Sequence, residues 1–275
     1  MGGLPVGKFD GVLFYTDYDD TLYNSAHTVS PENHAAIRYF QENGGRFSIA
    51  TGRAHRTFTP QISRESLTLN APVVLGNGAA LYDYDADRYL IRTFLDADAP
   101  ARLAALCAEF PDLALEAYHD DDIYVHNPNN VTTAHLAKVA GRQTPSPIPD
   151  MPTPWDKVIL EQHEPYLKQV QARLLALWGE QYEAIFSNPV LLEVTAKGSH
   201  KGAMVARAAQ LLGVSRENLY CMGDNQNDIP MLALSAIPFA PSNCSQAVRD
   251  WGARILGDCD DHAVAQAIEI LDKRY

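Results

Sequence analysis

Residues 17–21, DYDDT, place three carboxylates and the hydroxyl of Thr21 directly after an apolar run of strand length at residues 12–16. Side chains alternate between the two sides of an extended segment, so Asp17 and Asp19 lie on the same side. Two neighbouring carboxylates can divide catalytic work: one acts as a nucleophile or metal ligand, the other as a general acid and base. The same residues also fit a solvated acidic turn.

A second acidic segment, GDNQND at residues 223–228, follows the apolar run 218–222. Asp224 lies in the expected turn, and Asp228 lies near a helix start, where a carboxylate can also serve only as a cap. Open α/β sheets bind ligands at the carboxyl ends of their strands. Two acidic strand ends that face one cleft repel each other unless a cation lies between them. Ligands that are all oxygen atoms suit Mg²⁺.

Two further segments offer contacts for a phosphate group. Thr51 and Gly52, in the sequence ATGR, follow the apolar run 46–50 and precede a helix. A hydroxyl, accessible backbone N–H groups and a helix N-terminus favour an anion there. Lys201 lies in the first turn of a helix that Ser199 is expected to cap, where a cation is unfavourable without an anion nearby. An ordinary strand-to-helix turn and a solvated lysine also fit these residues.

Other ligand-binding patterns fail on spacing. An EF-hand starting at Asp17 needs Gly and Glu where Leu22 and Thr28 stand. The sequence contains no GxxxxGK[ST] run, which excludes a P-loop. Residues 76–81 begin like a dinucleotide fingerprint, but Leu81 takes the third glycine position and a hairpin is expected to follow. Four separated cysteines with no CxxC pair favour neither a disulfide framework nor a zinc site.

The elements that must position these residues alternate between strands and helices at both ends of the chain. The predicted strands cover residues 12–16, 46–50, 72–75, 218–222, 236–240 and 253–256. Helices are predicted after Ser30 and Ser199, near Asp228, from Asn243 and over residues 261–271. This alternation predicts an α/β fold with a Rossmann-like, doubly wound parallel sheet.

The middle of the chain follows a different, α+β pattern. Strands are predicted over residues 81–84, 89–94, 113–117, 122–126, 157–160, 182–186 and 190–194, and helices over 99–110 and 166–178. Five prolines between residues 145 and 154 predict a stiff loop without regular structure. We therefore predict a discontinuous core domain, residues 1–83 and 196–275, with an inserted cap domain at 84–195. Residues 1–10 are expected to form a loose end.

Composition narrows the class of protein. The chain has 275 residues, 46% of them hydrophobic, and a net charge of −12. The apolar content suffices for a sizeable core. The negative charge argues against nucleic acid as the main partner, since phosphate backbones require clustered Lys and Arg. No apolar stretch has the length of a membrane helix, and no secretory signal is recognised, so a cytoplasmic location is expected.

The four segments, in this order, resemble the haloacid dehalogenase (HAD) superfamily of phosphatases. DYDDT resembles its first motif, Thr51 in ATGR its second, Lys201 in SHKG its third and GDNQND its fourth. The long insertion and the NGA at residues 77–79 resemble the Cof-type branch, which carries a large α/β cap. The resemblance implies a Mg²⁺-dependent phosphatase that acts on small phosphorylated metabolites, such as sugar phosphates, through an aspartyl-phosphate.

Carried over to this sequence, the resemblance implies a role for each matching residue. Asp17 is the nucleophile and a metal ligand, and Asp19 is the general acid and base and lends its carbonyl to the metal. Asp224 is the other carboxylate of the metal site, and Asp228 orients the water shell of the metal. The phosphoryl oxygens are held by Thr51, Gly52, Lys201 and Asn227.

Two departures from the family pattern stand out: Asp20 where Gly is common, and Asn243 in a segment that usually carries small residues.

Two alternative functions remain open. One is a phosphotransferase or mutase on the same scaffold, and the other is a non-catalytic module that binds phosphorylated metabolites.

Overall fold

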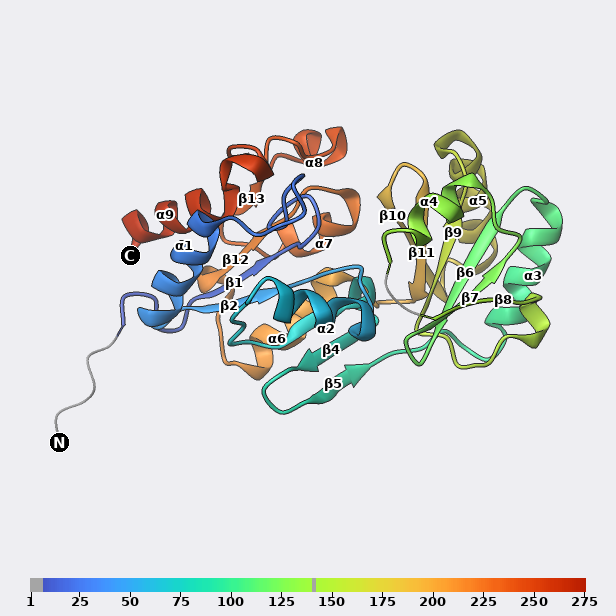
Figure 1. Cartoon of the computed structure of the whole chain (residues 1–275), viewed down its shortest axis with the longest axis horizontal. Coiled ribbons are helices and arrows are strands. Elements are labelled where there is room, and N and C mark those ends of the chain that lie inside the picture. Colours follow the sequence, from blue (N-terminus) through green and yellow to red (C-terminus); the bar gives the residue numbers. More distant parts are fainter. Residues whose placement is uncertain (1–6, 140–141) are drawn as a thin grey trace.

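The computed structural model describes residues 7–139 and 142–275, so residues 1–6 of the expected loose end lie outside it. The two ends of the chain build one part of the molecule, and the middle of the chain builds a second part beside it (Figure 1). The first part contains a five-stranded, all-parallel sheet in the order β14-β13-β12-β1-β2. Its strands are β1 (Leu13–Thr16), β2 (Arg46–Ile49), β12 (Leu219–Met222), β13 (Pro238–Ala240) and β14 (Arg254–Ile255). The predicted parallel α/β core is confirmed.

The predicted third strand of this sheet is placed differently. β3 (Val73–Leu75) pairs antiparallel with β4 (Ala80–Asp83), which pairs with β5 (Arg88–Arg92). An isolated parallel bridge between Ala50 and Val74 joins β3 to the parallel sheet. The short 3-10 turn Gly76–Gly78 reverses the chain after β3, and Asn77 adopts a left-handed conformation there, with a φ of 56°. The hairpin partner therefore completes the hydrogen bonding of β3.

The helices of this part cover the parallel sheet. They are α1 (Pro31–Glu42), α2 (His55–Arg64), α6 (Lys201–Leu211), α7 (Ile229–Leu232), α8 (Gln246–Trp251) and α9 (Ala263–Arg274). Ser30 caps α1 as predicted, through its hydroxyl and the N–H of Asn33. The first and last helices pack side by side (Figure 1), and the side chain of Asn33 accepts the N–H of Ala265.

The predicted cap of α6 is wrong by one residue. The N-cap is His200, whose Nδ1 accepts the N–H of Ala203 at 3.1 Å. Ser199 instead donates its hydroxyl to Thr93, which precedes the second part of the molecule. An imidazole acceptor at this position is uncommon, so the serine was the more obvious choice from sequence.

The second part is a six-stranded sheet in the order β10-β11-β9-β6-β7-β8. Its strands are β6 (Ala114–His119), β7 (Asp122–His126), β8 (Gln143–Pro145), β9 (Lys157–Glu161), β10 (Tyr182–Asn188) and β11 (Leu191–Ala196). Its helices are α3 (Ala99–Glu109), α4 (Asn130–Leu136) and α5 (Glu164–Trp178). The proline-rich segment is more regular than predicted, because β8 pairs with β7 and a 3-10 turn covers Ile148–Asp150.

The two faces of this sheet differ. Alternate residues such as Leu115 and Leu160 pack with α3 and α5 in one apolar cluster. The opposite face carries Tyr118 and Ile159, which pack with α4 residues and with Ala54 of the first part. This face therefore contacts the parallel-sheet part.

The division into a core and an inserted cap at residues 84–195 stays a proposal. β5 falls inside the inserted range, yet its Leu90 and Ile91 pack with core residues. No helix within residues 7–139 and 142–275 combines the length and the apolar character that crossing a bilayer requires.

Candidate active site

The two acidic segments meet at one edge of the parallel sheet. Thr16 of β1 and Met222 of β12 are register partners, so the residues that follow them leave the sheet together. The N–H of Asp17 donates to the carbonyl of Met222 at 2.8 Å. One carboxylate oxygen from each of Asp17, Asp224 and Asp228 lies within 4.8 Å of the others. The convergence expected from the strand positions is therefore present.

A buried lysine lies between two of these carboxylates. Lys201 Nζ donates to Asp17 Oδ1 at 2.7 Å and to Asp228 Oδ1 at 2.6 Å, and its side chain is only 1% exposed. Gly202 allows this placement, because a Cβ there would lie 2.3 Å from the carbonyl oxygen of Pro230. The start of α6 can therefore approach α7 closely enough for Lys201 to reach the carboxylates.

Asp228 both organises the turn and faces the lysine. Its Oδ2 accepts the N–H groups of Asp224 and Asn225, both at 3.0 Å, while its Oδ1 binds Lys201. Gly223 is needed for this fold of the turn, since a Cβ there would lie 2.4 Å from the Asp228 side chain. Thr21 donates its hydroxyl to Asp224 Oδ1 at 3.0 Å. The capping interpretation of Asp228 and its place in the charge cluster are thus compatible.

The buried cluster contains more negative than positive charge, which shifts the pKa values of its members. Burial, the charge of Asp228 and that of Asp19 raise the pKa of Asp17 to about 7, against the opposing effect of Lys201. Burial, together with the charges of Asp17 and Asp228, raises the pKa of Asp224 well above its usual range. Burial lowers the pKa of Lys201, but the two carboxylates more than compensate and raise it overall. Three carboxylates and one ammonium leave a negative excess when all are ionised.

This donor set fits a divalent cation. The converging oxygens are all carboxylate, which is the ligand type that Mg²⁺ prefers. A doubly charged ion balances the excess that three carboxylates leave beside one lysine. Clusters whose ionised form is costly without a partner are a physical signature of functional sites.

The predicted phosphate contacts lie beside the cluster. Thr51 is fully buried at the end of β2, and its Oγ1 accepts the N–H of Arg53 at 3.1 Å. Asn227 donates to Asn77 Oδ1 at 3.0 Å. Within the described residues, Asn77 Nδ2 and Asn227 Oδ1 are buried without a hydrogen-bond partner, and a Cβ on Gly52 would lie 3.0 Å from Asn77 Nδ2. A side chain at position 52 would therefore crowd the Asn77 amide, so glycine keeps this part of the site open to the two unpartnered atoms.

Asp19 stands apart from the other carboxylates. Arg53 binds it in bidentate fashion, with distances of 2.7 and 2.9 Å, and the Asp19 side chain remains 45% exposed. Arg53 also lies 5.4 Å from the ring centroid of Tyr18. In the sequence, Arg53 also fits an ordinary surface charge. The structure instead makes it the residue that orients Asp19.

The two departures from the family pattern have local explanations. Asp20 has a φ of 57°, in the left-handed region that glycine adopts freely and that aspartate tolerates better than most residues. Asn243 donates from Nδ2 to the carbonyl of Asp20 at 2.8 Å and accepts the N–H of Cys259 at 3.0 Å. Asn243 therefore supports the turn that carries the acidic residues.

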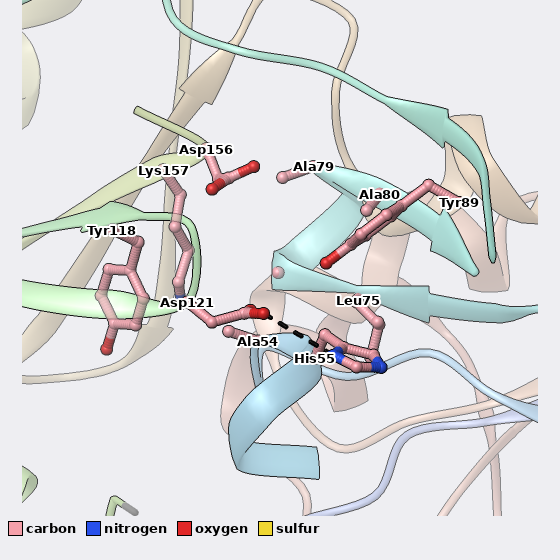
Figure 2. Close-up of a pocket in the computed structure, with 11 residues that line it drawn as sticks. Ala54, His55, Leu75, Ala79, Ala80, Tyr89, Tyr118, Asp121, Asp156 and Lys157 are labelled. Atoms are coloured by element: carbon pink, nitrogen blue, oxygen red, sulfur yellow. Dashed lines mark ion pairs between the residues drawn. The ribbon is translucent and has the colours of Figure 1, made fainter. Parts of the chain in front are cut away.

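The second part of the molecule closes over the site. Figure 2 shows a pocket between α2 and the β3–β4 turn on one side and the β6–β7 turn and β9 on the other. His55 faces Asp121 at 3.6 Å across this boundary, and Arg56 pairs with Asp122. The cavity volume is about 20 Å³, which holds about one water molecule. A cavity of this volume is too small to hold a phosphorylated metabolite.

Lys157 is a residue of this boundary that sequence reasoning missed. Its Nζ donates to the carbonyl of Gly52 at 2.9 Å and to Glu193 Oε2 at 2.8 Å, and its side chain is 3% exposed. The ammonium also lies 4.5 Å from the Tyr118 ring centroid. The available signal was a charged residue at the start of the apolar strand KVILE. Lys157 ties the second part directly to the Thr51–Gly52 turn.

Comparisons with known proteins agree with this arrangement. Pyridoxal phosphate phosphatase YbhA of Escherichia coli (strain K12) is 26% identical over 274 residues, covering 92% of this chain and 95% of that protein. The 5-amino-6-(5-phospho-D-ribitylamino)uracil phosphatase YcsE of Bacillus subtilis (strain 168) is 26% identical over 263 residues, covering 93% and 94%. The solved structure of the HAD subclass IIB sugar phosphatase BT4131 matches with a TM-score of 0.81 at 20% identity, over 95% of this chain and 99% of that chain.

The match to a known protein family extends over most of the chain. The family model for haloacid dehalogenase-like hydrolases matches residues 14–268, which include every motif that carried the resemblance. The chain therefore belongs to the haloacid dehalogenase-like hydrolases, as an enzyme of their Cof-type phosphatase branch.

Proposed function

We propose that this enzyme is a Mg²⁺-dependent phosphatase that hydrolyses small phosphorylated metabolites through a phosphoryl intermediate on Asp17. The observation that carries the proposal is the position of Asp17. Its carboxylate is buried beside Lys201, in a cluster whose ionised form is costly without a further cation. Lys201 and a bound cation would together stabilise the ionised form of Asp17. The ionised carboxylate can then attack the phosphorus atom of a phosphate ester.

The cation would be held by Asp17, Asp224 and the Asp19 carbonyl, with Asp228 orienting its water shell, as the family pattern implies. When bound, Mg²⁺ supplies positive charge that offsets the repulsion between the carboxylates and the phosphoryl oxygens. Lys201 adds a fixed ammonium at the same place. The family roles of Thr51, Gly52 and Asn227 as phosphoryl contacts belong to this proposal, and the unpartnered amide atoms of Asn77 and Asn227 support it.

The reaction then divides between two carboxylates. An oxygen of Asp17 attacks phosphorus as the bond to the leaving oxygen breaks, and Asp19 donates a proton to that oxygen. Asp19 next takes a proton from the water that attacks the aspartyl-phosphate, which restores Asp17 and frees phosphate. Asp19 must be protonated to act as the acid, so its bidentate contact with Arg53 has to loosen when substrate binds.

The substrate class follows from the closed boundary and from the relatives. The small cavity requires the second part to open for entry and to close around the leaving group. Relatives named for pyridoxal phosphate, a phosphoribitylamino-uracil and sugar phosphates support small phosphorylated metabolites as substrates. A cytoplasmic location belongs to the same proposal and is supported by four free, buried cysteines.

Phosphate release from p-nitrophenyl phosphate, with and without Mg²⁺, tests the proposal. We expect Mg²⁺-dependent release that Asp17→Asn abolishes and that Asp85→Asn, an exposed hairpin control, leaves intact. An undiminished Asp17→Asn enzyme would refute the assignment of the nucleophile. Faster phosphate transfer to an added alcohol than to water would instead indicate the phosphotransferase alternative. Failure on a broad panel of phosphorylated metabolites, with Mg²⁺ present and the protein folded, would indicate a binding module.

A further inference from the structure

The six-stranded sheet of the second part, called the cap sheet below, carries a second cluster of potential metal ligands, away from the candidate active site. Glu116 on β6, His135 on α4 and Glu161 on β9 each direct one ligand atom to a common point, with all three atoms within 4.8 Å of one another. His135 Nδ1 lies 3.1 Å from Glu116 Oε1 and 3.1 Å from Glu161 Oε1. The three residues come from three separate elements, and none belongs to a motif of the phosphatase site.

Glu161 shows that the cluster is incomplete as it stands. Its side chain is fully buried, and among the residues the structure describes neither carboxylate oxygen accepts a well-aligned hydrogen bond. The groups that face it are His135 Nδ1, at 3.1 Å from Oε1, and the hydroxyl of Thr132. A buried carboxylate without a donor or cation is strongly disfavoured. Both glutamates face the same imidazole nitrogen, which carries at most one proton to donate.

Glu116 is oriented toward the same point. Its Oε2 accepts the hydroxyl of Tyr118 at 3.0 Å, which leaves Oε1 facing His135. Metal-ligating carboxylates are held in this way, with the second oxygen fixed by a neighbouring donor. The arrangement is therefore that of an oriented ligand beside an unpartnered one.

The distances suit a shared ion. Ligand atoms about 2.1 Å from one metal, at tetrahedral to octahedral angles, lie about 3.0–3.4 Å apart. The two nitrogen–oxygen distances of 3.1 Å fall within this span. Imidazole with carboxylates selects a transition metal over Mg²⁺ or Ca²⁺, whose ligands are oxygen atoms.

The alternative occupant is a proton on His135. Burial lowers the pKa of His135, and the two glutamates raise it overall, to about 9. The protonated triad still has a net negative charge, and the single Nδ1 proton is shared between two carboxylates. A divalent cation with neutral imidazole and two carboxylates is electrically balanced.

We propose that Glu116, His135 and Glu161 form a structural site for a divalent transition-metal ion such as Zn²⁺. The ion fastens α4, a helix of seven residues, to β6 and β9 on the face of the cap sheet that meets the core. A helix this short is not stable alone, so an anchor of this kind has a clear structural use. The site does not depend on the proposed phosphatase chemistry.

Zn²⁺ binding to the metal-stripped full chain tests the site. Because the active-site carboxylates also bind cations, the measurement is made by calorimetry in an Asp224→Asn background. We expect one Zn²⁺ to bind each chain. Adding His135→Ala or the near-isosteric Glu161→Gln is expected to weaken binding at least about 100-fold, whereas His163→Ala, an exposed cap histidine, leaves it unchanged.

Co²⁺ as a probe separates this site from the partly exposed cluster Asp258, Cys259 and Asp260, the third group of potential ligands within the described residues. Ligation through Cys259 adds near-ultraviolet thiolate absorption, which the imidazole–carboxylate site lacks. Visible Co²⁺ bands without that absorption, lost with His135→Ala, support the proposal.

The proposal is overturned if the Asp224→Asn chain binds no Zn²⁺. It is equally overturned if the folded His135→Ala or Glu161→Gln variants bind Zn²⁺ as tightly as the Asp224→Asn background. Circular dichroism establishes that the variants are folded. With Mg²⁺ present, His135→Ala in the otherwise native chain is expected to retain phosphatase activity, which separates this site from failure of the proposed function.

Discussion

Replacing Asp17 by asparagine is expected to stabilise the metal-free protein while it destroys activity. Burial, with a contribution from Asp228, raises the pKa of Asp17 from 3.8 to about 7 even though Lys201 opposes the shift. At about 1.4 kcal/mol for each pH unit, keeping this carboxylate ionised in the folded state above pH 7 costs about 4 kcal/mol. Asparagine has nearly the same shape and no charge, so it removes up to that amount.

The advantage of the variant depends on pH in a defined direction. An acid whose pKa is raised by folding binds more protons in the folded state, so the free energy of unfolding falls as pH rises from about 4 to about 7. At pH 8 the full cost of about 4 kcal/mol applies to the native chain. At pH 4.5 Asp17 is protonated and neutral in the folded state, and the cost falls to about 1 kcal/mol.

Thermal unfolding in a chelator at pH 8 and pH 4.5, repeated with Mg²⁺ at pH 8, measures these differences. Since about 1 kcal/mol moves the melting temperature of a domain this size by about 2–4 °C, the variant is expected to melt several degrees higher at pH 8. The difference is expected to shrink at pH 4.5, and Mg²⁺ is expected to stabilise the native chain more than the variant. A variant that is less stable at pH 8 in chelator, or equally favoured at both pH values, would refute the reasoning. Asp85→Asn is the charge-matched control.

Three other substitutions probe separate parts of the account. Asp19→Asn is expected to lower kcat/KM, which reports phosphoryl transfer to Asp17, roughly 10²–10⁴-fold on an alkyl phosphate but far less on p-nitrophenyl phosphate, whose leaving group needs little protonation. Its kcat is expected to fall on both substrates, because both share hydrolysis of the intermediate. Equal losses of kcat/KM on the two substrates would argue against an acid role. Lys201→Met removes the cation that binds Asp228 and is expected to cost about 3–5 kcal/mol in urea unfolding with chelator present; unchanged stability would contradict the buried pairing. Lys157→Met is expected to cost a similar amount, because Glu193 loses its buried partner, and adding Glu193→Gln should recover most of it in a double-mutant cycle. If Glu193→Gln recovers no stability, the loss in Lys157→Met does not come from the unpaired Glu193 carboxylate.

The parallel core was predictable because strands alternate with helices at both ends of the chain. The carboxyl ends of parallel strands lie at one edge of the sheet, so two acidic segments that each follow a strand were expected at that edge. That their strands are neighbours, with Thr16 paired to Met222, is a finding of the structure. The position of β3 was not predictable, since its apolar run fits a parallel or an antiparallel partner equally well. The choice depends on the left-handed turn at Asn77.

The roles of the other site residues depend on contacts between residues that lie far apart in the sequence. Asn77 and Asn227 meet across 150 positions of the chain, and Lys157 reaches Gly52 from the inserted segment. Arg53 was visible in the sequence, but its fixed contact with Asp19 was not, because a surface arginine and an orienting arginine have the same local pattern. Such pairings exist only after the second part packs on the first.

The central claim is that Asp17 itself receives the phosphoryl group, and detection of the intermediate tests it most directly. The Asp19→Asn variant, in which hydrolysis of the intermediate lacks its base, is mixed with p-nitrophenyl phosphate, whose leaving group needs no acid, and Mg²⁺. It is then quenched in acid, digested and examined by mass spectrometry. The account predicts a phosphoryl adduct on the peptide that carries Asp17, absent without Mg²⁺ and absent when Asp17→Asn is added. Turnover by the native enzyme, together with an adduct on a different residue, would contradict it.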